Sequence, residues 1–352
     1  LRSAFPRTDE RSQMKRTFAT FFILCLVCLC IFADSSSVRL RSMGGIGIAV
    51  SDPRHPVVAN PASLYFLEND SSFVLDSSYS DSFLPNSGET FPTYPGSGLK
   101  GTFMGKRISF SIGFDYSVES TGIGDGIKYY NVYQTSEIRL DFCAGYGNFG
   151  AGIEVYGGST KQRVNVPIHQ STALSDFVIQ TYLSPYDRRS DSEYLQINLG
   201  FMYGMGGFTF GLMFDDILDN QDSKTALSWD TFVNEAGIGV YYVRDEYGRR
   251  GSLNHFGFSA GVEVSNLFRN STRTFHAGLE LSYMLLKDYG FYLRTGYEAL
   301  FSDFSLGTHS FGIGSRLDYV EFYLNFRFPL AVYRGLNSGD RFTVELAAAF
   351  SF

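Results

Sequence analysis

The sequence predicts an all-β fold, a transmembrane antiparallel β-barrel of about fourteen strands, from three observations. First, stretches of about ten residues recur between Leu99 and Phe352 in which every second side chain is apolar. Because side chains alternate across a strand, each stretch has one apolar and one polar face. Second, an apolar segment typical of an export signal lies near the start. Third, the last alternating stretch ends on an aromatic residue. These features are typical of a barrel that turns its apolar face to lipid.

Residues 14–33 are predicted to be a secretory signal peptide, which makes residues 1–13 an upstream extension from a start site placed too early. Two basic residues open the segment, an apolar run follows, and Ala33 suits cleavage before Asp34. The alternative is a transmembrane helix, which needs about 20 apolar residues. The run is shorter than that and ends in Asp34 and three serines. We therefore expect a mature chain that begins near Asp34.

Cysteine usage predicts a mature chain without an intramolecular disulfide. Cys25, Cys28 and Cys30 lie in the predicted signal peptide, so that Cys143 alone remains after cleavage. Lipidation of one of the first three is an alternative, but Val27 and Leu29 precede two of them where a small residue is expected.

Composition excludes other classes of protein. Aromatic residues make up 16% of the 352 residues, and the mean hydropathy is close to zero. A helical membrane protein would be far more hydrophobic, whereas the polar lumen face of a barrel offsets its lipid face. The net charge of −7 argues against nucleic-acid binding, which usually shows a basic footprint. No linker divides the chain, so residues 71–352 are expected to form one barrel domain behind an N-terminal segment over 34–70.

Each predicted strand is placed by apolar side chains at every second position, as in Ile138, Leu140 and Phe142. The strands are expected, within two to four residues, near 72–80, 99–104, 108–116, 138–146, 149–155, 195–201, 208–214, 238–242, 256–262, 275–283, 291–298, 307–315, 319–328 and 341–352. Very short turns alternate with long connections, which are expected near 81–98, 119–135, 158–193 and 215–235. Short periplasmic turns and long outer loops are typical of bacterial barrels, and the alternation places the C-terminus on the periplasmic side.

The final strand resembles the C-terminal signal by which the outer-membrane assembly machinery recognises barrel proteins. Its alternating apolar residues end on the last residue of the chain and include Phe342, Val344, Leu346, Phe350 and Phe352. An ordinary edge strand that ends on Phe is the alternative. A soluble β-sandwich would also alternate, but it would bury its apolar faces against each other.

Residues 34–70 lack the alternation and are predicted to pack inside the barrel. Gly44 and Gly45 permit positive φ and close backbone packing. Asn60 is a suitable helix N-cap and Pro61 suits the first helical position, so a short helix is expected over 61–66. A compact, glycine-rich segment of this kind would fit the lumen.

These residues resemble the start of the FadL/TodX outer-membrane transporters. A Met-Gly-Gly-x-Gly-x-Ala-Val stretch from Met43, an Asp-containing turn, and then Asn-Pro-Ala follow the signal peptide. The resemblance implies a fourteen-stranded barrel, an N-terminal hatch in the lumen, and import of long-chain fatty acids or other hydrophobic compounds through a lateral opening. The residues that match the hatch motif are Gly44, Gly45, Asn60, Pro61 and Ala62. Ser63 stands where a glycine is common, and the mature chain is short for a transporter with large outer loops.

No motif for catalysis, a metal or a cofactor stands out. The five histidines lack metal-ligand spacing. His309 and Ser310 are neighbours on a predicted strand and would point to opposite faces, so they cannot act as a pair. Acidic residues between Asp215 and Asp222 suit either Ca²⁺ or a solvated loop. Charged residues on the lumen face are expected to pair with one another or to form a selectivity lining; they are Arg139, Asp141, Arg294, Glu298, Glu321 and Arg327.

Together with the barrel pattern, the resemblance to the FadL/TodX transporters implies a non-enzymatic bacterial outer-membrane transporter for long-chain fatty acids or similar hydrophobic small molecules, gated by its hatch and needing no cofactor. The expected partners are the outer-membrane bilayer, the hydrophobic ligand and the barrel-assembly machinery, with no nucleic acid. An outer-membrane scaffold or adhesin that uses the 158–193 connection is the main alternative. A general polar pore is a further alternative, which the predicted plug disfavours.

Overall fold

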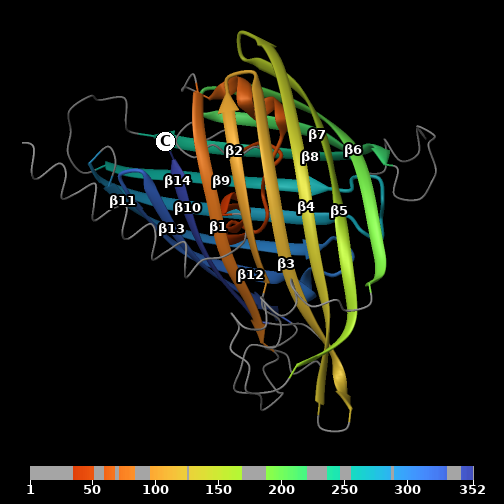
Figure 1. The fold of residues 1–352 in the computed structure, drawn as a ribbon. Coiled ribbons are helices and arrows are strands. Elements are labelled where there is room, and N and C mark those ends of the chain that lie inside the picture. Colours follow the sequence, from red (N-terminus) through yellow and green to blue (C-terminus); the bar gives the residue numbers. More distant parts are fainter. Residues whose placement is uncertain are drawn as a thin grey trace, which may run out of the picture.

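The protein folds into a closed barrel of fourteen antiparallel strands (Figure 1). The computed structural model describes residues 35–50, 59–67, 71–83, 96–124, 127–168, 188–219, 236–245, 255–286, 289–330 and 342–351. Each strand pairs with its neighbours in chain order, and β1 pairs with β14, for example Leu75 with Phe350, to close the ring. The predicted fold class and strand number are confirmed.

Two short helices precede the barrel, α2 (Ser35–Ser42) and the 3-10 helix η1 (Pro61–Phe66). The strands are β1 (Ser71–Phe83), β2 (Gly96–Gly105), β3 (Ile108–Gly124), β4 (Ile127–Tyr146), β5 (Phe149–Ile168), β6 (Arg188–Met205), β7 (Phe208–Asp219), β8 (Ala236–Asp245), β9 (His255–Ser265), β10 (Thr274–Leu286), β11 (Tyr289–Leu300), β12 (Thr308–Leu317), β13 (Val320–Pro329) and β14 (Phe342–Ser351). A third short helix, η3 (Phe304–Leu306), lies between β11 and β12. None of the helices in the described ranges is long and apolar enough to cross a membrane.

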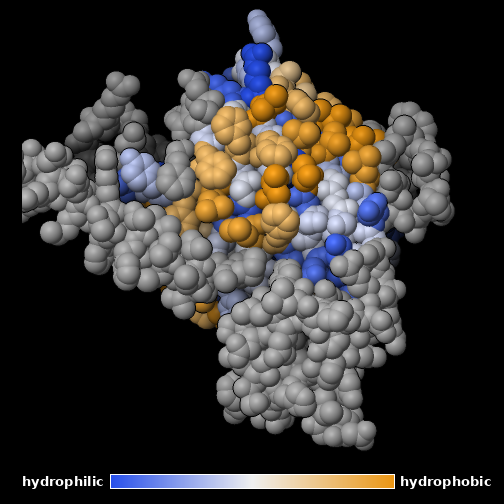
Figure 2. Space-filling model, in the orientation of Figure 1, coloured by the Kyte–Doolittle hydropathy of each residue, from blue (hydrophilic) through white to orange (hydrophobic). Residues whose placement is uncertain are grey.

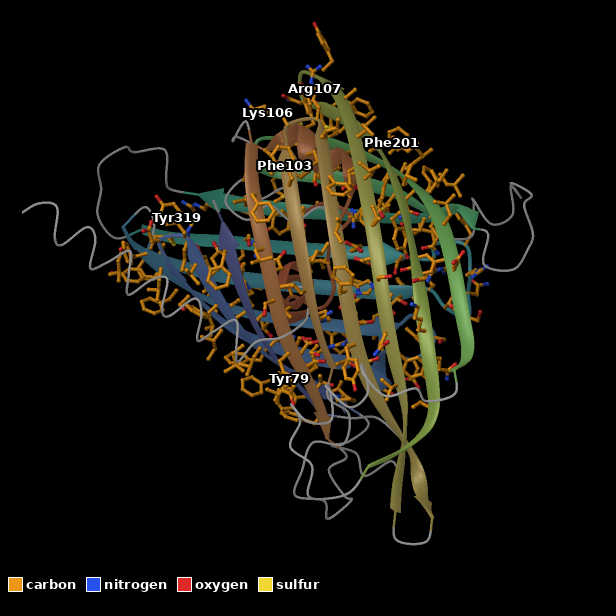
Figure 3. The ribbon with its side chains drawn as sticks, in the orientation of Figure 1. Tyr79, Phe103, Lys106, Arg107, Phe201 and Tyr319 are labelled. Atoms are coloured by element: carbon orange, nitrogen blue, oxygen red, sulfur yellow. The ribbon has the colours of Figure 1, made fainter. Side chains whose placement is uncertain are left out.

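The strands turn apolar side chains outward and polar side chains inward. In β11, Phe291 and Leu293 are exposed, whereas Tyr292 and Arg294, which alternate with them, are buried. Figure 2 shows hydrophobic residues gathered in a band over the front strands, near the end at which Figure 3 places Lys106 and Arg107. A surface of this kind is suited to lipid, as the sequence predicts.

Strands β3 to β5 are longer than the apolar pattern predicts. The connection expected over 119–135 is wrong, because β3 runs to Gly124 and β4 starts at Ile127. The connections expected over 158–193 and 215–235 are likewise shortened by β5, β6 and β7. Hydroxyl pairs join the strands here, with Ser136 Oγ 3.0 Å from Ser159 Oγ. The sequence of these parts mixes polar and apolar residues without the regular alternation that marks a lipid-facing strand.

Several predicted features lie outside the described residues. They are the upstream extension over 1–13, the signal peptide over 14–33 with its three cysteines, and the last residue, Phe352. Of the proposed C-terminal signal, Leu346 is an exposed outward side chain and Phe350 is buried. The assembly role of these residues stays a prediction.

Candidate functional site: the N-terminal segment inside the barrel

Residues 35–50 and 59–67, here called the N-terminal segment, pack against the inward face of the barrel. Helix α2 contacts β1 and β11 to β14, and helix η1 contacts β4, β5 and β6. Val38, Met43, Ala62 and Leu64 are completely buried, although no strand contains them. The segment therefore has a defined place on the inner wall.

Glycines of the wall allow the backbone of the segment to approach the backbone of the strands. A Cβ added to Gly296 would lie 1.9 Å from the Gly44 nitrogen, and one added to Gly278 would lie 2.2 Å from the Met43 carbonyl oxygen. Gly278 is paired with Gly261 on β9 and with Gly296 on β11, so that three glycines stand side by side. No side chain larger than hydrogen fits between the segment and this wall.

A second close approach lies on β5 and β6, where helix η1 begins. A Cβ on Gly152 would lie 2.5 Å from the Pro61 carbonyl carbon, and one on Gly200 would overlap the Asn60 side chain. Gly152 and Gly200 are cross-strand partners. The two ends of the segment are therefore seated on glycines of different strands.

Gly44 and Gly45 have a positive φ, 76° and 82°, which glycine at these positions permits. They follow the end of α2, where the Gly45 backbone N–H donates to the Leu40 carbonyl at 2.8 Å. Glycine at this position ends a helix without the steric cost that a side chain would bring. The turn directs the following residues along β9 and β8, where Ile46 and Ala49 lie against the wall.

Asn60 joins the two parts of the segment. Its Oδ1 accepts a hydrogen bond from the Ala62 backbone N–H at 3.0 Å, and its Nδ2 donates to the Ile48 carbonyl at 2.8 Å. The predicted cap and the helix over 61–66 are confirmed, although the helix is of the tighter 3-10 type. Asn60 thus does more than cap a helix, because it also holds the preceding part of the segment.

A buried ion triad fixes helix α2 to the wall. The Arg39 guanidinium donates to both carboxylate oxygens of Glu280, at 3.2 and 3.3 Å. Arg294 Nε donates to the same carboxylate at 2.6 Å. All three side chains are only 1% exposed. Removal of one partner of such a buried pair usually costs about 3–5 kcal/mol, because a charge is left uncompensated.

Further polar contacts hold the backbone after α2. One Glu263 oxygen accepts hydrogen bonds from the Gly47 and Ile48 N–H groups, each at 2.7 Å. His276 Nδ1 lies 2.8 Å from the Gly44 carbonyl oxygen and must donate to it, because a carbonyl only accepts. Arg41 forms a 2.7 Å ion pair with Glu345 on β14. These groups anchor the segment at several points.

The lumen charges predicted from the sequence form a paired network. Arg139 bridges Asp141 and Glu154, Arg327 pairs with Glu298 at 2.9 Å, and Arg316 pairs with Glu321 at 3.6 Å. Sequence reasoning missed the central partners Glu154 and Glu280, whose positions follow from alternation only once the strand register is known.

A cavity of about 400 Å³ remains beside α2, between β1 to β4 and β14. Arg41 and Lys100 line it together with Glu137 and Glu345. Lys100 lies 3.7 Å from Glu137 across the strands. Asp115 lines the cavity as well, so the cavity is polar and its three carboxylates outnumber its two basic groups.

The structure gives no support for a catalytic His309–Ser310 pair or for a metal site among the described acidic residues of β7. His309 is exposed on the outer face and Ser310 is buried on the inner face, so the two side chains point apart. Asp215 and Asp219 belong to β7 instead of a loop. Within the described ranges no cluster of three potential metal ligands occurs.

The barrel is similar to solved structures of hydrocarbon channels. A CymD monoaromatic hydrocarbon channel matches with a TM-score of 0.53 at 12% identity, over 89% of this chain and 95% of that one. A TodX deltaS2S3 mutant channel matches with 0.53 at 13% identity, over 90% and 98%. The P. putida toluene transporter TodX matches with 0.50 at 11% identity, over 89% and 97%. No protein-family profile and no curated relative matches the sequence.

These neighbours are described as channels and transporters. At such low identity the likeness concerns the fold. The chain has the closed fourteen-stranded fold of the TodX-type channels, as its resemblance to the FadL/TodX transporters implies.

Proposed function

We propose that this protein is an outer-membrane channel for the uptake of small hydrophobic molecules, with long-chain fatty acids as one substrate class. The N-terminal segment acts as its hatch. The observation that carries the proposal is the seat of this segment: its backbone lies against Gly278 and Gly296, and Glu280 holds its helix. The fold shared with hydrocarbon channels supports the same function.

The contacts of the N-terminal segment suit a hatch that is displaced when a ligand binds. Moving α2 off the wall separates Arg39 from Glu280 and Arg41 from Glu345, and both glutamates are almost fully buried. Arg294 stays beside Glu280, so that the carboxylate keeps one partner when Arg39 leaves. A ligand can shift this equilibrium only by the difference in its affinity for the two states.

We propose that cargo leaves sideways, at the interruption between β6 and β7. Ile197 pairs with Leu218 and Leu199 with Phe214, so that residues 215–217 of β7 face Asn198 alone. A break of this kind removes ladder hydrogen bonds and bends the strand. A disulfide between Leu199→Cys and Phe214→Cys, the paired residues that border the interruption, is expected to slow uptake and to be reversed by a reductant.

The proposal is tested by uptake of oleate and, separately, toluene into proteoliposomes that contain the refolded barrel. Asn60→Ala removes the bonds to Ala62 and Ile48, and deletion of residues 35–69 removes the segment. Asn148→Ala, in an exposed turn, is the matched control. Saturable uptake that both hatch changes alter and the control does not would support the proposal. No uptake by a folded barrel would refute transport, and equal uptake by all variants would refute gating.

One observation supports the alternative function as a scaffold or adhesin. Strands β4 and β5 are each 20 residues long and project beyond the shorter strands of the barrel (Figure 1). A projecting sheet of this kind offers a surface for a partner. A folded barrel that binds neither oleate nor toluene would favour this function.

A further inference from the structure

The outward face of β8 to β12 carries an apolar groove of about 480 Å³. Ala260 and Ala277 form its floor, because their short side chains stand among larger ones. Val262 and Leu279 are their cross-strand partners and border the floor. Val262 is half exposed, so the groove opens on the side that faces lipid. A groove here would be filled by apolar matter from the bilayer.

The groove does not lead into the lumen. Gly261, Gly278 and Gly296 stand behind it, and their strands are paired without interruption at these positions. The N-terminal segment covers the inner side of the same glycines. The groove is therefore a site on the outer wall, separate from the cavity beside α2.

Tyr297 and His309 line one end of the groove, and a cluster of three phenylalanines lies next to this end. Phe275 contacts Phe304, with ring centroids 5.6 Å apart, and Phe301 contacts Phe304 at 5.3 Å. Phe301 and Phe304 are each about 40% exposed, and Tyr297 Oη donates to the Phe304 carbonyl. Aromatic rings are enriched where the apolar core of a membrane meets its headgroups.

Basic residues stand directly beyond the aromatic cluster. The Arg273 guanidinium lies 5.8 Å from the Phe301 ring centroid and donates to Asn270 Oδ1 at 2.7 Å. Its Nε is buried and has no hydrogen-bond partner among the described residues. Arg269 is exposed on the same loop. The loops 266–273 and 301–307 carry two arginines and one acidic residue, Asp303, whose carboxylate accepts hydrogen bonds from Ser305, so this end keeps an excess of positive charge.

We infer that this surface binds an anionic, phosphate-bearing membrane lipid, with one acyl chain in the groove and the phosphate at Arg273 and Arg269. The order apolar groove, aromatic cluster, basic loop matches the order acyl chain, interface, phosphate along such a lipid. Arginine is suited to phosphate because its N–H groups can donate in pairs. The site is independent of the proposed transport function.

The test is native mass spectrometry of the delipidated full-length barrel with an equimolar mixture of phosphatidylglycerol and phosphatidylcholine of identical chains. Wild type is expected to retain phosphatidylglycerol in preference. Arg273→Gln should lower that preference about fivefold, since a basic residue near a membrane contributes about 1 kcal/mol. Ala277→Phe, which fills the groove, should lower retention of both lipids, and Ala260→Phe fills it from the neighbouring strand.

Matched controls make the same changes elsewhere. Arg107→Gln lies in an exposed turn at the other end of the barrel, and Ala144→Phe is an exposed outward change on β4. Equal retention of the two lipids by wild type would overturn the inference. The inference would also be overturned if the Arg273 and Ala277 variants retained the two lipids in the same amounts and the same proportion as their control variants. Displacement of phosphatidylglycerol by equimolar oleate would also overturn it and mark the groove as a cargo site, whatever the uptake assay reports.

Discussion

Replacement of Gly296 by alanine should displace the N-terminal segment while the barrel still forms. The new Cβ would lie 1.9 Å from the Gly44 nitrogen and 2.1 Å from the Met43 carbonyl carbon. Ordinary contact begins at 3.4 Å, so the segment must move by about 1.5 Å. Gly296 lies in the middle of β11, where the ladder to Gly278 and Ser310 is continuous and tolerates alanine.

The cost follows from the contacts that a shift of this size disturbs. Overpacking of a close contact costs about 1–3 kcal/mol. The His276 bond to the Gly44 carbonyl is the nearest polar contact, and its loss would add about 1–3 kcal/mol. Since 1.4 kcal/mol is a factor of ten, the displaced fraction should rise at least about fivefold, and at least about thirtyfold if the bond is also lost.

Hydrogen–deuterium exchange of residues 35–50 measures the displaced fraction without reference to transport. Gly101→Ala is the matched control, because its Cβ would meet only the Phe73 ring, at 3.7 Å. Exchange should rise in Gly296→Ala and stay at the wild-type rate in the control, with equal heat-modified mobility of both barrels. If the two variants exchange alike, the glycine contacts do not seat the segment and the reasoning fails.

Other changes probe the polar anchors and the C-terminus. Glu280→Gln leaves Arg39 and Arg294 without a carboxylate, so we expect faster exchange of residues 35–42, a loss of about 3–5 kcal/mol in the free energy of unfolding, and therefore a lower Tm. Glu263→Leu should increase exchange at Gly47 and Ile48, whereas Glu263→Gln, whose amide oxygen still accepts, should have a smaller effect. Deletion of Phe352 should lower the heat-modifiable fraction recovered from membranes; an unchanged fraction would exclude it from the assembly signal.

The barrel could be predicted because lipid imposes a period of two on every strand that crosses it. Strand β13 shows this, with Phe322 and Leu324 outward and Glu321 and Tyr323 buried inward. The ends of β3 to β5 could not be predicted in this way. Beyond their apolar stretches, β4 and β5 are joined by hydroxyl pairs such as Ser136 with Ser159, and such pairs leave no apolar period in the sequence.

The N-terminal segment was only partly predictable. The Asn60 cap and the positive φ of Gly44 depend on local backbone chemistry, which a short motif reveals. Helix α2 has no such signal, because its sequence is rich in serine and arginine and its stability comes from partners far away in the chain. Arg39 and Glu280 are 241 residues apart, so their pairing requires the whole barrel.

The inward-facing glycines of the barrel wall connect the strand pattern, which is visible in the sequence, with the position of the N-terminal segment, which is not. Alternation places Gly278 on the lumen face as soon as Ala277 and Leu279 are assigned to lipid. An isolated glycine there would only weaken the strand. Three of them side by side on β9, β10 and β11 leave a flat strip of backbone that would be an open void unless another backbone filled it. The register that aligns them depends on the turns, which is why the path of residues 43–46 follows from the folded barrel and not from any one strand.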